Sequence, residues 1–305
     1  MFDSQYCCTS LDNLGGIKML KASQLGITVS VLVLLGVAPF SVAQQQVVDP
    51  AVVHKESVGS EADLAQDLTN PLADLMTIPI QVTYDSDIGP EDKGSRYTTN
   101  IQPVIPISIS DDWNVITRTI IPIISQDDIF TNAGSQSGLG DINLSLFFSP
   151  TEKTSGGVIW GVGPVFLLPT ADDDLLGADK WAAGAGFVAL TFAGNLTYGM
   201  LGNHMRSFAG DNDRADIELT FLQPFAAYTW PSAWTASVSS EVTYNHEAHE
   251  WGVPLQLSVS KLVFLGGKLP VSFMAGVGQW VESTDIGAEG IRFRLQANIV
   301  LPKPF

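Results

Sequence analysis

Residues 291–301 read IRFRLQANIVL, and every second side chain in this stretch is apolar. Ile291 and Phe293 alternate with Arg292 and Arg294. A period of two residues is typical of an extended strand whose two faces meet different surroundings. The apolar face of such a strand contacts either a protein core or lipid, and the rest of the chain decides between them.

The chain of 305 residues is apolar on average and acidic where it is charged. Charged residues make up 15% of it, hydrophobic residues make up 45%, and the formal net charge is −17. About a quarter of the residues of a typical soluble domain are charged. A strongly acidic chain cannot neutralise phosphates, so we expect no nucleic-acid partner.

Residues 1–43 read as a secretory signal peptide that is removed before folding. Lys18 and Lys21 precede an apolar run, and Ser41-Val42-Ala43 then fits the small-x-small rule for cleavage. Retention of this segment as a membrane anchor is the alternative. The residues upstream of Met19 do not resemble the start of a signal peptide, which indicates that Met19 is the true start.

The chain offers no basis for a disulfide framework. Its two cysteines, Cys7 and Cys8, both lie in the predicted signal segment. The exported chain would therefore contain none, although export exposes a protein to oxidising surroundings.

Residues 44–75 are predicted to form a periplasmic segment that contains one short helix. Ser60 or Asp63 would cap this helix, and Pro71 would interrupt it. Leucines recur at helical spacing at positions 64, 68, 72 and 75. We expect the segment to pack as a plug or lid, with an interaction segment in the periplasm as the alternative.

From residue 76 onward the alternation predicts about twelve strands and no further helix. The predicted strands are 76–85, 98–109, 113–124, 140–149, 157–168, 181–192, 195–203, 216–229, 234–244, 253–263, 270–281 and 290–301. Each is long enough to cross a bilayer when tilted, which takes about 9–11 residues. The weakest are 98–109, which carries two prolines, and 181–192, which is rich in alanine and glycine.

The connections between these strands alternate in length. Long, acidic connections such as 169–180 and 204–215 alternate with tight ones such as 110–112 and 193–194. Long loops at one end and short turns at the other are typical of outer-membrane barrels, whereas a soluble sandwich has no reason to sort its loops. Backbone groups in lipid must all be paired, so such a sheet has to close.

The predicted fold class is therefore all-β, a transmembrane antiparallel β-barrel over residues 76–305 in the cell outer membrane. Tryptophans and tyrosines near strand ends fit interfacial girdles. The expected partners are outer-membrane lipid, lipopolysaccharide and the barrel-assembly machinery, which commonly reads an aromatic C-terminus such as Phe305. The residues Pro302-Lys303-Pro304 before it break the usual strand pattern.

Several stretches resemble the bacterial outer-membrane family known as "MetA-pathway of phenol degradation", whose members are sometimes labelled neuromedin U. The most specific are GLGDINLSLFFSP at 138–150 and GVGPVFLLPT at 161–170, and the resemblance spans about residues 70–301. It implies a barrel linked to the transport of hydrophobic or aromatic compounds. The tail IVLPKPF departs from the family, whose members usually end near an LFP motif.

Charged residues on the predicted inner faces are the candidate lumen-lining residues of a channel. They are Arg118, Glu218, Glu241, Arg292 and Arg294. Charges inside a barrel either tune a channel or cross-link a plugged lumen. Both interpretations stay open at this point, because twelve strands enclose a narrow lumen.

Two acidic stretches are weak candidates for metal binding. His246, Glu247, His249 and Glu250 have spacings that would suit a metal on a loop, although the pattern is not that of a metalloprotease helix. The aspartates at 172, 173, 174 and 179 lack the spacing of an EF-hand. A solvated loop is the preferred interpretation of both, so no metal site is predicted.

We expect no enzymatic activity and no cofactor. The Gly138–Asp141 turn resembles no phosphate-binding loop, and a lipid hydrolase would need a serine, a histidine and an acid in contact. Ser207 and His204 lie close in sequence but lack an evident acid partner. The predicted function is a channel for small hydrophobic or aromatic solutes by passive diffusion, with a lipid-modifying enzyme or a structural barrel with a plugged lumen as alternatives.

Overall fold

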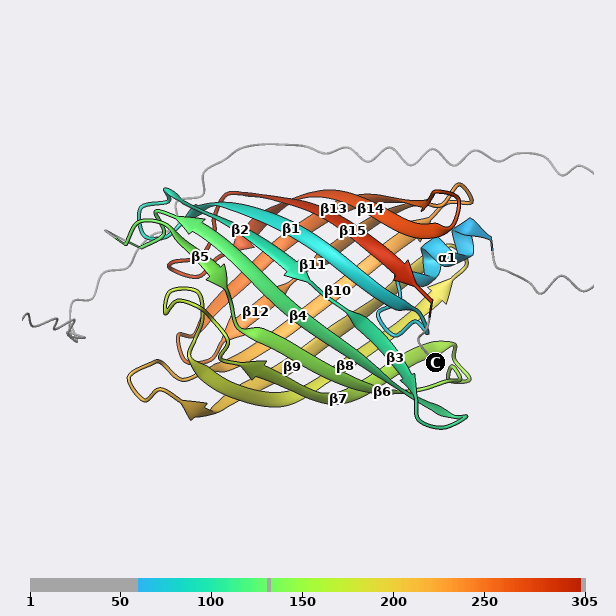
Figure 1. The fold of residues 1–305 in the computed structure, drawn as a ribbon, viewed down its shortest axis with the longest axis horizontal. Helices are drawn as coiled ribbons and strands as arrows, with labels where there is room; N and C mark the ends of the chain where they lie inside the picture. The colour runs from blue at the N-terminus through green and yellow to red at the C-terminus, as the bar shows by residue number, and fades with distance from the viewer. Residues whose placement is uncertain (1–59, 131–132, 303–305) are drawn as a thin grey trace, which may run out of the picture. The chain divides into compact units, whose positions relative to one another are not determined.

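The computed structural model describes residues 60–130 and 133–302, which form an antiparallel β-barrel with one short helix (Figure 1). These residues belong to one compact unit, Lys55–Phe305. The predicted signal peptide, the start at Met19, the cysteines and the terminal Phe305 lie outside the described residues. Within the described ranges, no helix is long and apolar enough to cross a membrane.

The strands follow one another around the barrel in chain order. They are β1 Met76–Ile88, β2 Gly94–Ile101, β3 Val104–Ser108, β4 Trp113–Asp127, β5 Gln136–Leu139, β6 Ile142–Pro150, β7 Val158–Leu168, β8 Lys180–Ala193, β9 Leu196–Gly210, β10 Glu218–Thr229, β11 Trp234–Ser240, β12 Val242–Asn245, β13 Glu250–Leu265, β14 Leu269–Glu282 and β15 Ile291–Leu301. Every pairing between neighbours is antiparallel, as expected for hairpin connections.

The barrel is closed and has twelve strands in the described part of the chain. The segments β2 and β3, β5 and β6, and β11 and β12 each continue one another along a single barrel strand. The first strand pairs with the last from Met76↔Leu301 to Asp85↔Arg292, which leaves no open edge. The predicted fold class is confirmed.

The direction of the side chains shows whether the apolar face of the strands contacts a protein core or lipid. Phe293 and Leu295 of β15 are 52% and 62% exposed on the outside of the barrel. Arg292, which precedes Phe293, and Arg294, which lies between Phe293 and Leu295, are only 8% and 6% exposed because they point into the lumen. Large apolar side chains on the outside of a closed barrel are suited to lipid.

Exposed tryptophans and tyrosines gather near the strand ends, as predicted for interfacial girdles. At the end of the short connections, here called the turn end, they are Trp113, Tyr198, Tyr228, Trp230 and Trp234. At the opposite end, here called the loop end, they are Tyr97, Trp181 and Trp251. Amphipathic rings of this kind prefer the boundary between lipid and water.

The predicted strands are all present, but several run further toward the loop end than expected. The first ends at Ile88 rather than at residue 85, and β9 ends at Gly210 rather than at residue 203. Ladder pairs such as Lys180↔Gly210 hold these polar and glycine-rich ends in the sheet. Pairing with a neighbouring strand overrides weak local strand propensity, so the loop-end connections are shorter than predicted.

The predicted helix is α1, Glu61–Asp67, and it begins with a capping box. The Asp63 amide donates to Ser60 Oγ at 3.2 Å, and the Ser60 amide donates to Asp63 Oδ2 at 2.7 Å. The helix ends before Pro71 rather than being interrupted by it, because the residue before a proline disfavours the helical region. It lies at the turn end (Figure 1), where Gln66 Nε2 donates to the Gly194 carbonyl at 2.7 Å.

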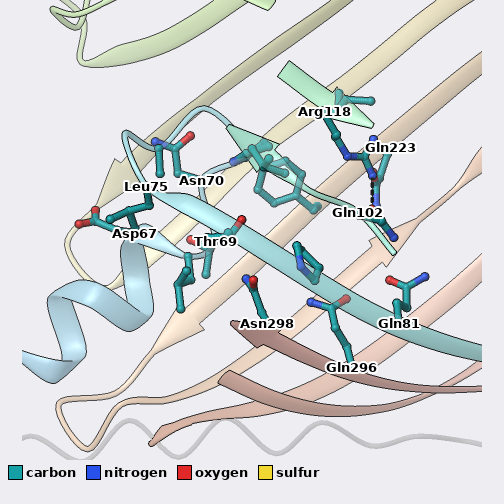
Figure 2. Close-up of a pocket in the computed structure, with 18 residues that line it drawn as sticks. Asp67, Thr69, Asn70, Leu75, Gln81, Gln102, Arg118, Gln223, Gln296 and Asn298 are labelled. Carbon is teal, nitrogen blue, oxygen red and sulfur yellow. Dashed lines mark hydrogen bonds between the residues drawn. The ribbon is translucent and has the colours of Figure 1, made fainter. Parts of the chain in front are cut away.

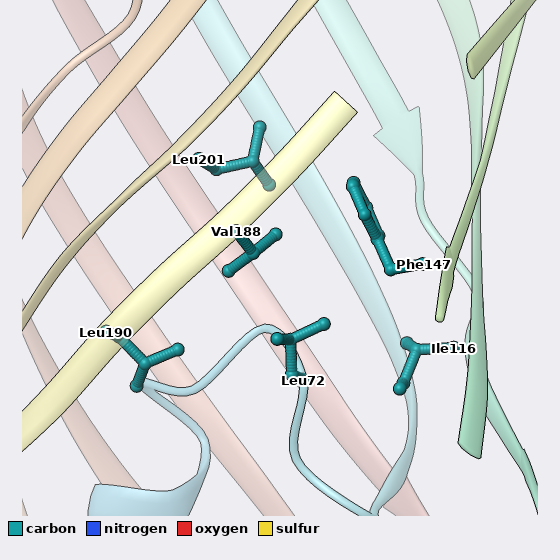
Figure 3. Close-up of a cluster of buried hydrophobic side chains, with 6 residues drawn as sticks. All are labelled: Leu72, Ile116, Phe147, Val188, Leu190 and Leu201. Carbon is teal, nitrogen blue, oxygen red and sulfur yellow. The ribbon is translucent and has the colours of Figure 1, made fainter. Parts of the chain in front are cut away.

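The chain between α1 and β1, residues 68–75, is here called the crossing segment because it lies across the lumen at the turn end. Leu72 at its centre is 7% exposed and packs in a buried apolar cluster (Figure 3). The cluster comprises Leu72, Ile116, Phe147, Val188, Leu190 and Leu201. A second contact joins Thr69 Oγ1 to Thr197 Oγ1 at 2.9 Å. The segment is therefore packed against the inner wall.

Candidate lumen site

Two arginines of β15 form an ion-pair network on the lumen wall. Arg292 donates through Nε and Nη2 to the two carboxylate oxygens of Asp85, at 2.8 and 3.1 Å. Its Nη1 donates to Glu241 Oε2 at 3.0 Å. Arg294 donates through Nη1 and Nη2 to both oxygens of Glu241, each at 2.8 Å. Two-pronged pairs of arginine with a carboxylate are strong and fix the geometry of both side chains.

This network joins strands that are far apart in the sequence. Asp85 comes from β1, and Glu241 stands at the break between β11 and β12. Trp280 of β14 donates from Nε1 to Asp85 Oδ1 at 3.1 Å, and its ring lies 4.6 Å from the guanidinium carbon of Arg292. Two positive charges meet two negative charges, so this part of the wall is close to neutral.

Arg118 of β4 lies apart from the network. Its Nη2 donates to Gln102 Oε1 at 2.9 Å. In the described part of the chain, no carboxylate lies within ion-pair distance of its guanidinium. A guanidinium carries five N–H donors, and the bond to Gln102 uses one of them. Arg118 is thus a charged lumen group whose hydrogen-bonding capacity is largely open.

Glu218 does not join the other four predicted lumen charges, and its predicted position is corrected here. Its neighbours Ile217 and Leu219 line the lumen, so Glu218 points to the outside of the barrel. Its carboxylate lies 3.6 Å from Arg206 Nε and 3.9 Å from His204 Nε2. The position in the alternation decides the face of a strand residue, and the inner positions next to Glu218 in the strand, Leu219 and Phe221, are apolar.

A cavity of about 540 Å³, here called the central cavity, occupies the middle of the lumen. One side of it is polar and contains the ion-pair network. This side comprises Gln81, Thr83, Asp85, Thr98, Asn100, Gln102, Arg118, Ser237, Ser239, Glu241, Ser258, Arg292, Arg294 and Gln296, with Met274 of β14 among them. The other side is largely apolar and comprises Ile120, Leu167, Met205, Ile217, Leu219 and Phe221, with Asn143, Asn203 and Gln223 among them. A solute inside would meet both kinds of surface.

A second cavity of about 250 Å³, the turn-end cavity, lies between the central cavity and the crossing segment (Figure 2). Asp67, Thr69, Asn70 and Leu75 line it from the side of α1. Five side chains line both cavities and so mark their junction. They are Gln81, Gln102, Arg118, Gln223 and Gln296. In Figure 2 the hydrogen bond between Arg118 and Gln102 lies at this junction.

The histidine-rich stretch lies on the outside of the barrel at the loop end. Thr220 Oγ1 is 3.0 Å from His204 Nδ1 and 2.9 Å from His246 Nε2, and the two imidazole rings meet edge to face. The other weak metal candidates, Glu247 and His249, are exposed. Among the described residues, no group of three or more potential ligands is placed to hold a metal ion.

The serine and histidine of the enzyme alternative belong to separate hydrogen-bond groups. Ser207 Oγ donates to Asp216 Oδ1 at 3.2 Å and accepts from the Ile217 amide at 3.0 Å. His204 contacts Thr220 instead. Lys180 also donates to Asp216 at 3.1 Å, and this bond together with that from Ser207 lowers the pKa of the Asp216 carboxyl. The arrangement around Ser207 serves the connection between β9 and β10.

The aspartates of the 169–179 connection mostly organise the loop itself. Asp172 Oδ2 accepts the Leu139 amide at 2.7 Å, and Asp173 Oδ1 accepts the Leu175 amide at 2.8 Å. Asp174 and Asp179 line a small surface cavity of about 90 Å³ with them. Asp172 and Asp173 thus cap backbone amides of the loop.

The comparisons with known proteins concern the fold. No protein-family model matches the chain, and no curated protein matches it. Among solved structures it is similar to the COG4313 outer membrane channel from Pseudomonas putida F1, with 15% identity and a TM-score of 0.59. This match covers 74% of this chain and 96% of that one. A weaker likeness is to the NanC porin, with 8% identity, a TM-score of 0.47 and coverage of 74% and 99%.

The chain is an outer-membrane β-barrel. Its closed twelve-stranded sheet, its apolar outer belt and its fold likeness to a barrel of the outer membrane agree on this point. At 15% identity the likeness concerns the fold alone, so the lumen of this barrel has to be interpreted from its own residues.

Sequence reasoning missed four residues of the lumen site: Thr83, Asp85, Gln102 and Trp280. The signal for Asp85 was present, because Gln81, Thr83 and Asp85 alternate with apolar residues in the first strand. Trp280 was interpreted as part of an outer girdle, although its position in the alternation puts it inside. Gln102 lies at the break between β2 and β3, where the alternation gives no guidance.

Proposed function

We propose that the outer-membrane barrel is a channel through which small hydrophobic or aromatic solutes diffuse passively. The observation that carries this proposal is the central cavity of about 540 Å³, which is polar on one side and largely apolar on the other, with Asn143, Asn203 and Gln223 among the apolar residues. Ligand sites of this size are typically apolar with a few placed polar groups. An aromatic solute with one polar substituent matches both sides of the cavity.

The family resemblance supports the same class of solute. The stretches at 138–150 and 161–170 resemble a family linked to the movement of aromatic compounds, and both contribute residues to the barrel wall. The proposed organisation is a signal peptide at residues 1–43, a periplasmic segment at 44–75 and the barrel from residue 76. The turn end then faces the periplasm, as short turns do in such barrels.

The crossing segment controls the periplasmic exit in this proposal. Leu72 fills an apolar site on the inner wall, with the turn-end cavity on one side of the segment and a further cavity of about 260 Å³ on the other. A solute leaves either around the segment or after Leu72 has left its site. The plugged structural barrel remains the competing function, because the same contact favours a closed lumen.

Solute uptake tests the proposal in cells and in vesicles. A strain without the gene should take up a small labelled aromatic solute such as benzamide more slowly, and the intact gene should restore the rate. Vesicles containing the purified barrel should release benzamide faster than vesicles without protein, whereas release of a disaccharide should not change. Equal benzamide release with and without the barrel would rule out the channel and leave the plugged barrel.

A further inference from the structure

We propose that Arg118 is a recognition site for the carboxylate of an amphipathic organic anion, so that the preferred solutes of the channel are small aromatic or aliphatic acids. This inference rests on the proposed channel function and names the class of solute within it. It starts from the charged side chains that line the lumen, among which the arginines outnumber the carboxylates.

The charges that line the central cavity do not balance. Three arginines, Arg118, Arg292 and Arg294, face two carboxylates, Asp85 and Glu241, which leaves one positive charge. This is unusual in a chain whose formal net charge is −17. A narrow lumen with low-dielectric walls strengthens the field of such a charge, so an anion is favoured over a cation there.

The hydrogen bonds show that Arg118 is the one of these three arginines without a carboxylate partner among the described residues. Each carboxylate oxygen of Asp85 and Glu241 already accepts from Arg292 or Arg294. Glu241 stands near enough to act on Arg118 electrostatically, but its oxygens are committed to the two arginines of β15. Among the described residues no carboxylate lies within ion-pair distance of Arg118, so the carboxylate of a solute would be its first direct partner and would leave this network intact.

The position of Arg118 suits a transport site. It lines both the central cavity and the turn-end cavity, so its guanidinium is one of the groups at the junction between them. Gln102 holds the side chain by one Nη2 bond, which leaves the other donors available to a carboxylate. A planar guanidinium matches a carboxylate by two parallel hydrogen bonds.

The apolar part of the solute has a surface of its own. The apolar side of the central cavity includes Leu219 and Phe221 of β10 and Ile120, two positions along β4 from Arg118. An acid with an apolar body therefore meets a charged anchor and an apolar wall in one cavity. A small inorganic anion would use only the first of them.

Benzoate and benzamide test this inference, because they share shape and differ in charge. In planar bilayers containing the purified barrel, benzoate should block the potassium chloride current at about tenfold lower concentration than benzamide, as expected for a hydrogen bond to a charged group. In the Arg118→Gln variant the advantage of benzoate should disappear, and in Arg118→Lys it should be partly kept. Benzamide release from vesicles should stay above that of protein-free vesicles in both variants, which shows that the barrel is still open.

Arg96→Gln is the matched control, because Arg96 of β2 also bonds a single glutamine, Gln126 Oε1 at 2.9 Å, but lines neither cavity. It should keep the benzoate advantage. An equal effect of benzoate and benzamide on the unaltered barrel, or a benzoate advantage that survives Arg118→Gln, would overturn the inference while leaving the channel intact. Failure of benzamide release from vesicles would instead overturn the channel itself.

Discussion

Replacing Leu72 by alanine should release the crossing segment from the inner wall. Leu72 is 7% exposed and packs against Ile116, Phe147, Val188 and their neighbours. Leu→Ala substitutions at buried sites cost about 2–5 kcal/mol. Leu72 also borders a cavity, so its site can relax. We therefore expect a value near the low end, about 2–2.7 kcal/mol, which corresponds to about a 30- to 100-fold shift toward the released segment.

A thiol at the neighbouring position reports this shift. The chain from residue 9 onward has no cysteine, so Ala73→Cys creates a single thiol in residues 9–305. In vesicles, Leu72→Ala should raise its rate of reaction with a charged maleimide by about the same 30- to 100-fold. The single-channel current should increase as well.

Leu175→Ala is the control, because Leu175 is 37% exposed on a loop-end connection. It should change neither the reaction rate of the thiol nor the current. A rate increase of less than about threefold in Leu72→Ala, in a barrel that is otherwise folded, would show that the apolar cluster does not hold the segment.

Two further perturbations test the charges. Glu241→Gln removes the carboxylate partner of the buried Arg294 and one of the two carboxylate partners of Arg292. It should lower the free energy of unfolding by about 3 kcal/mol in urea titrations. Glu218→Gln loses only an outer ion pair and should cost less than about 1 kcal/mol, so similar losses in the two variants would refute the network. Burial and the nearby Asp63 raise the pKa of Asp67 in α1, with Lys153 acting in the opposite direction. Because the pKa of Asp67 is raised where α1 is docked, protonation of Asp67 stabilises the docked helix and crossing segment. The current should therefore fall as the pH is lowered and Asp67 becomes protonated. In Asp67→Asn the current should stay constant over the same change of pH.

The alternation of the sequence predicts the face of a strand residue but not its partner. Arg292 and Arg294 were assigned to the lumen because they alternate with Ile291 and Phe293. That both bind Glu241 follows from the curvature of the sheet, which brings β15 near the break between β11 and β12 although β13 and β14 lie between them; Glu241 is 51 positions before Arg292. Contacts of this kind depend on strand tilt and stagger, which local pattern does not encode.

Glu218 shows the opposite limitation. It was assigned to the lumen because it is charged, although its position in the alternation puts Leu219 inside. Glu218 lies at the loop end of β10, beyond the apolar belt, where an outward-facing carboxylate next to Arg206 costs little free energy. Charge is thus a weak guide to the face near strand ends, and the alternation is the stronger one.

The strand with the weakest alternation marks the contact with the crossing segment. The predicted strand 181–192 is rich in alanine and glycine and has apolar residues on both faces. Its inner residues Val188 and Leu190 contact Leu72 rather than water, so they have no reason to be polar. Phe147 breaks the alternation of β6 for the same reason. A lumen wall that is apolar where the crossing segment lies and polar elsewhere is what a barrel with a docked internal segment requires, so a polar residue at Val188 should loosen that segment as Leu72→Ala does.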